Sequence, residues 1–153
     1  MKVFARSKNE FEDIMLTGRI TDENVEQQDS AFISILSPGK VINPNRSFYA
    51  RPYFERDHAN VITMDFDDIV SPEHGSPFTP EMAEKTVKFI IANKDKKVFL
   101  VHCAAGISRS GAIATFINDN FGGDTEEFKK WNPQIMPNNL VLRLLYEAYE
   151  KLK

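Results

Sequence analysis

The segment between residues 98 and 117 limits the fold most strongly, because three patterns follow one another there without a linker. Residues 98–101 read VFLV, an apolar run that predicts a short buried strand. The small-residue stretch CAAG follows almost at once, and its glycine tolerates backbone conformations that other residues avoid. Ile113, Phe116 and Ile117 then recur at helical spacing. This segment therefore predicts a strand, a tight loop and a helix in direct succession.

The remaining patterns extend this unit to an α/β architecture. Apolar runs at 31–36 and 59–66 predict two more strands, and the weak alternation of residues 1–6 indicates an edge strand. Further helices are predicted over residues 7–18, from Pro80 into the polar stretch NKDKK, over 125–131 and over 137–152. We therefore expect a single domain of residues 1–153, with a central, mostly parallel sheet and helices on both faces.

Two of these helices carry an apolar stripe on one face. Core packing is the expected role of the stripe in the last helix. The stripes consist of Phe11, Ile14 and Met15 in the first helix, and Val141, Leu144, Leu145, Ala148 and Leu152 in the last.

Composition narrows the class of protein. The chain has one cysteine, which excludes an internal disulfide, and its net charge of −3 provides no bulk attraction to nucleic acid or anionic lipid. The N-terminal stretch MKVFARSKNEFED is too charged for a signal peptide, and no apolar run has the length of a membrane span. We therefore expect a cytoplasmic monomer with neither nucleic acid nor membrane as a partner.

The single cysteine, Cys103, lies directly after the predicted central strand. Ligands of open α/β sheets bind at the carboxyl ends of the strands. The small residues after Cys103 let the backbone curl, so that its N–H groups and the next helix N-terminus converge on one anion. Arg109 adds a bidentate fork, and the same positive field lowers the pKa of the thiol. The expected phosphate-binding residues are Ala104, Ala105, Gly106, Ile107, Ser108 and Arg109.

The stretch HCAAGISRS resembles the His-Cys-x-x-Gly-x-x-Arg-Ser/Thr signature of cysteine-dependent protein tyrosine phosphatases, most of all in their dual-specificity branch. The segment FKKWNPQIMPNNLVLRLLYEAYE is also similar to that branch, where a Pro-Asn pair opens the last helix. The resemblance covers roughly residues 59–152 and is much weaker over the first 58. It implies a phosphatase fold, a phosphorylated protein substrate, a phosphocysteine intermediate at Cys103, and no cofactor or metal.

Three residues around the loop have expected supporting roles, and two of them have simpler alternatives. Ser110 is placed to hydrogen-bond the sulfur and ease its departure, although helix capping is an alternative. His102 is expected to anchor the loop, not to act as a base. Asn138 either braces the loop or only starts the last helix. The other two histidines, His58 and His74, are expected to be solvated.

The chemistry also needs a carboxylic acid to protonate the leaving group. The resemblance implies an aspartate some thirty-odd residues before the cysteine, in the stretch MDFDDIVSPEHGSP. Asp68, 35 positions before Cys103, ranks first, Asp67 second and Asp65 a distant third. An acidic turn in contact with solvent is the alternative for each of them.

Four functions remain open on the sequence. A phosphatase of phosphotyrosine, with phosphoserine and phosphothreonine as further substrates, is preferred. The second is a phosphoinositide or RNA 5′-phosphatase of the same fold, for which Arg46, Arg51 and Arg56 would have to form a basic rim. The third, a rhodanese-like sulfurtransferase, needs no acid loop. The fourth, a non-catalytic phosphoprotein-binding module, usually lacks the cysteine, arginine or acid that are all present here.

Overall fold

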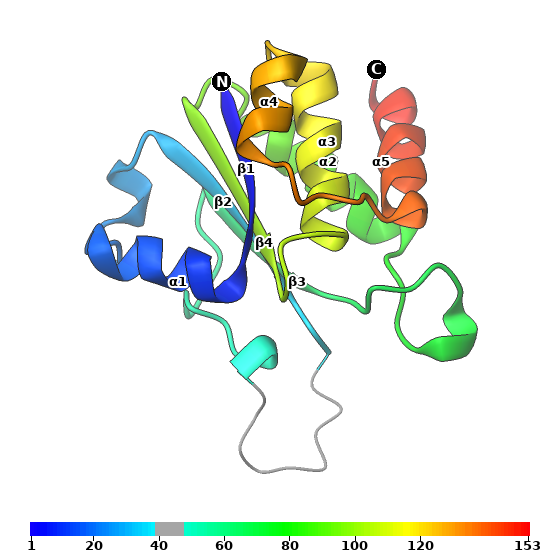
Figure 1. Cartoon of the computed structure of the whole chain (residues 1–153), viewed down its shortest axis with the longest axis horizontal. Coiled ribbons are helices and arrows are strands. Elements are labelled where there is room, and N and C mark those ends of the chain that lie inside the picture. Colours follow the sequence, from blue (N-terminus) through cyan, green and yellow to red (C-terminus); the bar gives the residue numbers. More distant parts are fainter. Residues whose placement is uncertain (39–47) are drawn as a thin grey trace.

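Four parallel strands form one sheet in the order β1-β4-β2-β3 (Figure 1). The computed structural model describes residues 1–38 and 48–153. The strands are β1 (Lys2–Ser7), β2 (Ser30–Leu36), β3 (Val61–Asp65) and β4 (Val98–Cys103). The predicted edge strand is thus β1, and the strand before the cysteine lies inside the sheet, between β1 and β2.

Helices cover both faces of this sheet. They are α1 (Lys8–Thr17), α2 (Pro80–Ala92), α3 (Arg109–Phe121), α4 (Thr125–Trp131) and α5 (Asn139–Leu152), with short 3₁₀ turns η1 (Val25–Gln27), η2 (Phe48–Ala50) and η3 (Pro72–His74). One buried cluster joins α2, α3, α4 and α5 to one face, and a smaller cluster joins α1 to the other. This confirms the predicted α/β class, and the sheet is parallel throughout.

Helix starts follow local signals in the sequence. Ser7 and Glu10 form a capping box at α1, in which the Ser7 hydroxyl accepts from the Glu10 N–H at 3.1 Å. Thr79 caps α2 by accepting from the Met82 N–H at 3.1 Å, and Pro80 takes the first helical position. These helices therefore begin where side chains satisfy the free N–H groups of the first turn.

Helix α1 packs on the sheet through Phe11 and Met15, whereas Ile14 is 43% exposed. Two sequence expectations need correction. Leu152 is 37% exposed in the last turn of α5, while the other members of its stripe are buried. Strand β4 is longer than the apolar run and continues through His102 to Cys103, because these residues pair with the last two of β1.

The carboxyl ends of all four strands lie at one edge of the sheet, at the bottom of Figure 1. The loop from β4 to α3, the loop from β3 to α2 and the start of α1 therefore meet there. Within residues 1–38 and 48–153, no helix has both the length and the apolar character that crossing a membrane requires.

Candidate active site

Cys103 is the last residue of β4, and it is 2% exposed. Its sulfur lies 3.1 Å from the Ser110 hydroxyl oxygen and accepts from the Gly106 N–H at 3.2 Å. Burial raises the pKa of the thiol, but hydrogen bonds from the Ser110 hydroxyl and N–H, the Arg109 charge and the Gly106 N–H lower it more. The net shift of the pKa is downward, which favours the thiolate.

The carbonyl groups of the loop after Cys103 are bound on its outer side. In a planar trans peptide the next N–H points away from the carbonyl, so these contacts turn the following N–H groups inward. Four contacts do this: Ala104 O accepts from Lys8 N at 3.3 Å, Gly106 O from Gln134 Nε2 at 3.0 Å, Ile107 O from Met136 N at 3.0 Å, and Ser108 O from Asn138 N at 3.0 Å. The loop thereby has the geometry of an anion-binding nest.

Gly106 is required by the backbone itself. Its φ is +75°, a left-handed conformation that side chains disfavour. A Cβ at this position would also lie 2.4 Å from the Arg6 carbonyl carbon and 2.5 Å from the Ser7 nitrogen. The loop can therefore lie against the end of β1 only with glycine here.

Arg109 is the first residue of α3 and is 6% exposed. Its Nη1 donates to the Phe66 carbonyl at 2.8 Å, and Nη1 and Nη2 both lie 3.4 Å from the Ser37 hydroxyl oxygen. Among the described residues no hydrogen bond engages Nε, so the edge formed by Nε and Nη2 remains available for two oxygens of a phosphate. The sequence analysis did not identify Ser37 or Phe66.

Ser110 and His102 are both buried and both contact Cys103. Ser110 is fully buried within α3, whose N-cap is Ser108. The Ser110 hydroxyl therefore contacts the Cys103 sulfur and does not cap the helix. His102 is 1% exposed, with its ring 4.2 Å from that of Phe11 and its Nδ1 3.4 Å from the Cys103 carbonyl. Burial, with smaller contributions from nearby positive charges, lowers the His102 pKa to about 3, so the ring is neutral at physiological pH.

The structure brings Asp68 to the loop between β4 and α3. Its Oδ1 accepts from the Ser108 hydroxyl at 2.8 Å and from Asn138 Nδ2 at 2.9 Å. Asn138 therefore has both roles considered for it. Its Oδ1 caps α5 by accepting from the Val141 N–H at 3.1 Å, while its main-chain N–H donates to Ser108 O and its side-chain amide donates to Asp68.

The other two aspartates are placed differently. Asp67 Oδ2 accepts from the Ser76 N–H at 2.8 Å, and the Asp67 N–H donates to the Ser76 carbonyl at 2.7 Å. Asp67 thus closes the base of the loop between β3 and α2. Asp65 is an exposed residue at the end of β3. Asp68 is the member of this group whose carboxylate contacts the loop that carries Cys103.

Gln134 is a supporting residue that the sequence analysis missed. Its Nε2 donates to the Ala5 carbonyl at 2.9 Å and to the Gly106 carbonyl at 3.0 Å, so it ties the edge strand to the loop. Neighbouring Asn132 accepts from the Ala5 N–H at 2.7 Å and donates to the Val3 carbonyl at 2.9 Å. No local pattern indicates these contacts. Those to Val3 and Ala5 join residues more than one hundred positions apart, and the contact between Gln134 and Gly106 joins two irregular segments.

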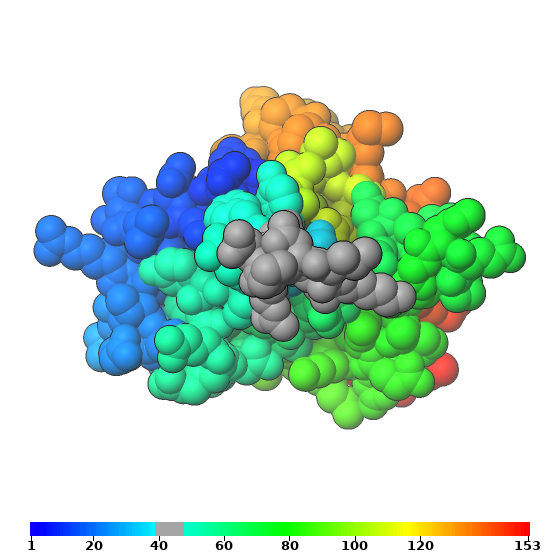
Figure 2. Space-filling model, turned by 90° about the horizontal axis from the view of Figure 1, so that it is seen from below, coloured from blue at the N-terminus to red at the C-terminus, as the bar shows by residue number. Residues whose placement is uncertain are grey.

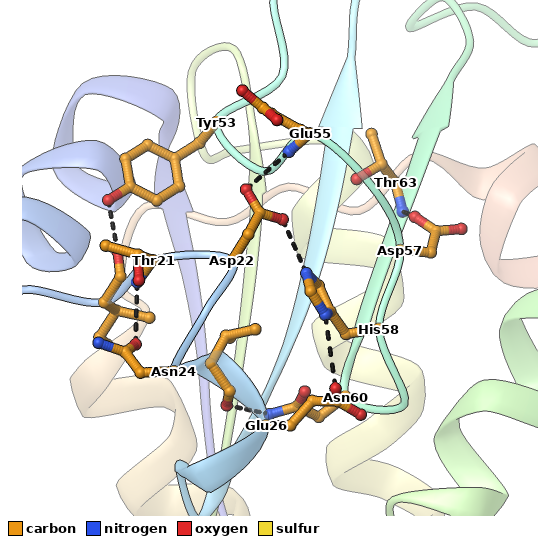
Figure 3. Close-up of polar contacts among 12 residues, drawn as sticks. Thr21, Asp22, Asn24, Glu26, Tyr53, Glu55, Asp57, His58, Asn60 and Thr63 are labelled. Atoms are coloured by element: carbon orange, nitrogen blue, oxygen red, sulfur yellow. Dashed lines mark hydrogen bonds and ion pairs between the residues drawn. The ribbon is translucent and has the colours of Figure 1, made fainter.

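A separate polar cluster surrounds His58 (Figure 3). The His58 side chain is 2% exposed, which corrects the expectation that it is solvated, and its Nε2 lies 2.7 Å from Asp22 Oδ1. Asp22 also accepts from the Glu55 N–H at 3.0 Å. The cluster joins the loop before β3 to the segment after α1, so its role is structural. His74 is exposed, as expected.

Two of the three arginines considered as a basic rim, Arg51 and Arg56, lie among the described residues. Arg51 borders a cavity of about 220 Å³ beside Lys8, whereas Arg56 acts electrostatically on Asp22. Arg46 lies outside the described residues. In the described part of the chain, no three His, Cys, Asp or Glu side chains gather as a metal site requires.

Comparison with known proteins identifies the fold. No family model matches the sequence, and no curated protein matches it significantly. Among solved structures, human DUSP28 is 17% identical over 98% of this chain and 92% of its own, with a TM-score of 0.50. PTPMT1 in complex with PI(5)P is 17% identical over 99% and 92%, with a TM-score of 0.51. DUSP15 is 18% identical over 97% and 84%, with a TM-score of 0.51. The chain therefore has the fold of the dual-specificity-like cysteine phosphatases, as its loop sequence predicts.

Proposed function

We propose that this protein hydrolyses phosphate esters of proteins, phosphotyrosine first and phosphoserine and phosphothreonine as well, through a phosphocysteine intermediate. One observation carries the proposal. A thiol with a lowered pKa, an arginine with a free bidentate edge and a tethered carboxyl group surround one anion-binding loop. These are the nucleophile, the anion ligand and the acid that such a reaction requires.

In the first step the Cys103 thiolate attacks phosphorus, and a sulfur–phosphorus bond forms as the bond to the ester oxygen breaks. Arg109 and the inward N–H groups hold the other phosphate oxygens and stabilise their charge. Asp68, in its protonated form, gives its proton to the departing oxygen, so the product leaves as a neutral alcohol or phenol.

In the second step the Asp68 carboxylate takes a proton from water, and the water oxygen attacks phosphorus. The sulfur–phosphorus bond breaks, inorganic phosphate is released, and Cys103 leaves as a thiolate. The Ser110 hydroxyl, 3.1 Å from the sulfur, stabilises this leaving group by donating a hydrogen bond. Neutral His102 takes no part in either proton transfer.

A phosphoinositide is the second candidate substrate, because PTPMT1 was solved with PI(5)P. The five residues between Cys103 and Arg109 are Ala, Ala, Gly, Ile and Ser, and none of them carries a charge. The phosphodiester of the PI(5)P headgroup is a second negative charge that finds no cationic side chain in this loop, which favours a singly phosphorylated side chain.

The test compares turnover of phosphotyrosine, phosphoserine and phosphothreonine peptides with vesicles containing PI(5)P, without added metal. We expect phosphate release from the phosphotyrosine peptide by the wild type and none by Cys103→Ser, which retains peptide binding. Release from the vesicles alone would assign the lipid substrate. Peptide binding without any turnover by the wild type would make the protein a phosphoprotein-binding module and overturn the proposal.

A further inference from the structure

Asp67 directly precedes the proposed acid in the chain, and the proposed mechanism does not use its carboxylate. Two hydrogen bonds join it to Ser76. Its Oδ2 accepts from the Ser76 N–H at 2.8 Å, and its own N–H donates to the Ser76 carbonyl at 2.7 Å. The first of these bonds has an ionised acceptor and is therefore of the stronger kind. Together they form a clamp, the Asp67–Ser76 clamp, at the base of the loop of residues 68–75.

Gly75 leaves the space that this clamp requires. A Cβ at position 75 would lie 2.4 Å from Asp67 Oδ2 and 3.2 Å from the carboxyl carbon of Asp67. The φ of Gly75 is +152°, which other residues also disfavour. The Asp67 carboxylate can therefore reach the Ser76 N–H in this arrangement only because position 75 has no side chain.

The chain is also fixed on both sides of the clamp. Phe66, one residue before it, is fully buried, and its carbonyl accepts from Arg109 Nη1 at 2.8 Å. Phe78, two residues after it, is also buried, and the centroids of the two rings lie 4.8 Å apart. The ring pair therefore joins the same two chain segments that the clamp joins, and the ends of the loop are held twice.

Asp68 is the first residue of the clamped loop, and its side chain is tied to the loop between β4 and α3. Its Oδ1 accepts from the Ser108 hydroxyl at 2.8 Å and from Asn138 Nδ2 at 2.9 Å. Figure 2 shows this edge of the molecule, where the bright green segment of the clamped loop borders the yellow-green segment after β4. Asp68 is exposed, and hydrogen bonds of exposed groups open easily unless the backbone that carries them is held.

We propose that Asp67 is a positioning residue that holds Asp68 at the loop between β4 and α3, so that the acid is in place without rearrangement of its own loop. Asp67 neither gives nor takes the transferred proton and acts only through Asp68. The inference rests on the proposed phosphatase function and on Asp68 as its acid. Position matters for such a group, because a misplacement of about 1 Å can lower the rate by about 10²-fold.

The test compares Asp67→Ala, which removes the side-chain contact of the clamp, with Asp67→Asn, whose amide oxygen can keep it. Both are assayed on a phosphotyrosine peptide and on an activated aryl phosphate, whose phenolate leaves without a proton. We expect Asp67→Ala to lower kcat on the peptide by about tenfold to 10²-fold with KM unchanged. Turnover of the aryl phosphate should change by less than about twofold, because it needs little acid catalysis. Asp67→Asn should restore kcat on the peptide.

Asp124→Ala is the matched control for lost stability. Asp124 caps α4 by accepting from the Glu126 N–H at 2.9 Å, so this variant also removes a carboxylate from a main-chain N–H. It makes no contact to the loop that carries Asp68 among the hydrogen bonds of the described residues. We expect it to leave kcat on both substrates unchanged.

Gly75→Ala provides a second route, because its Cβ would displace the Asp67 carboxylate while both aspartates remain. It should show the same dependence on the leaving group. Gly123→Ala is its control, since a Cβ at Gly123 would meet no atom within 4 Å. The double variant Asp67→Ala/Asp68→Asn should be no slower than Asp68→Asn alone, because Asp67 acts through Asp68.

Several results would overturn the inference. Equal losses on the two substrates, an effect on KM alone or a double variant slower than Asp68→Asn would show that Asp67 supports the fold or substrate binding. A loss in Asp67→Asn as large as in Asp67→Ala would show that the charge matters and not the position. If Asp67→Ala does not fold, an unchanged kcat of Gly75→Ala on the peptide overturns the inference equally. Absence of Cys103-dependent turnover in the wild type would instead refute the proposed function, and this inference with it.

Discussion

The Ser108 hydroxyl donates a 2.8 Å hydrogen bond to Oδ1 of Asp68, which lies 40 residues earlier in the chain. Ser108 belongs to the loop between β4 and α3, and Asp68 belongs to the loop between β3 and α2. The bond therefore joins the segment that carries the nucleophile to the segment that carries the proposed acid. The two loops follow β4 and β3, which flank β2, and both leave the sheet at the edge where the strands have their carboxyl ends, so they can meet across the end of β2.

Asp68→Asn should lower kcat by roughly 10²–10⁴-fold, the usual contribution of general acid catalysis. Substrate binding should change little, because Arg109 and the loop N–H groups remain. The loss should be larger for a phosphopeptide than for an activated aryl phosphate, whose phenolate leaves without a proton. Steady-state kinetics on both substrates measure these effects.

Asp67→Asn is the control for this prediction. Asp67 closes its loop by accepting from the Ser76 N–H, so an asparagine oxygen can keep that contact. We expect no dependence of its effect on the leaving group. If Asp67→Asn shows that dependence and Asp68→Asn does not, the acid is Asp67 and our assignment is wrong.

Ser110→Ala should affect the sulfur in two ways. Its hydroxyl is one of the groups that lower the Cys103 pKa, so its loss raises that pKa and moves the low-pH limb of kcat/KM to higher pH. The phosphocysteine should also break down more slowly, because the departing thiolate loses a donor. Rapid mixing should then show a burst of released phenol. A variant with an unshifted pH profile and no burst would contradict both roles.

Arg109→Lys should lower kcat/KM by about 10²–10³-fold, the usual cost of removing a donor to transition-state charge. An ammonium cannot keep the contacts to the Phe66 carbonyl and the Ser37 hydroxyl while also offering two parallel N–H groups to phosphate. Competition by inorganic phosphate should weaken as well. Arg143→Lys, in an exposed pair with Glu147 at 3.0 Å, should behave as the wild type. Near-normal kinetics of Arg109→Lys would exclude the bidentate role.

His102 should make stability depend on pH. Its pKa falls from 6.5 to about 3 on folding, so the folded state resists protonation that the unfolded chain accepts. Its contribution is complete above about pH 6.5 and is lost as the pH falls towards about 3, at up to ~1.4 kcal/mol per pH unit. Denaturant unfolding of wild type and His102→Gln across this range measures the difference in slope.

The exposed His74 supplies the control for that measurement, because His74→Gln should leave the slope of the wild type unchanged. Equal slopes for the wild type and His102→Gln would show that His102 does not resist protonation in the folded protein.

The sequence by itself determined the features that depend on neighbouring residues. An apolar run followed by small residues and helical spacing predicted the unit that carries Cys103, Gly106 and Arg109. Side chains such as Ser7 and Thr79 marked helix starts because they act within one turn. These signals are local, so they can be read without knowledge of the partner segments.

Tertiary structure decided whatever depends on contacts between distant segments. Arg109 is held by Phe66 and Ser37, which are 43 and 72 positions away, and Asp68 is distinguished from Asp67 by contacts to different loops. The burial of Lys8 and the exposure of Ile14 likewise depend on what packs against α1. Parallel strands bring their carboxyl ends to one edge whatever the length of chain between them, and no local pattern records which side chains then meet.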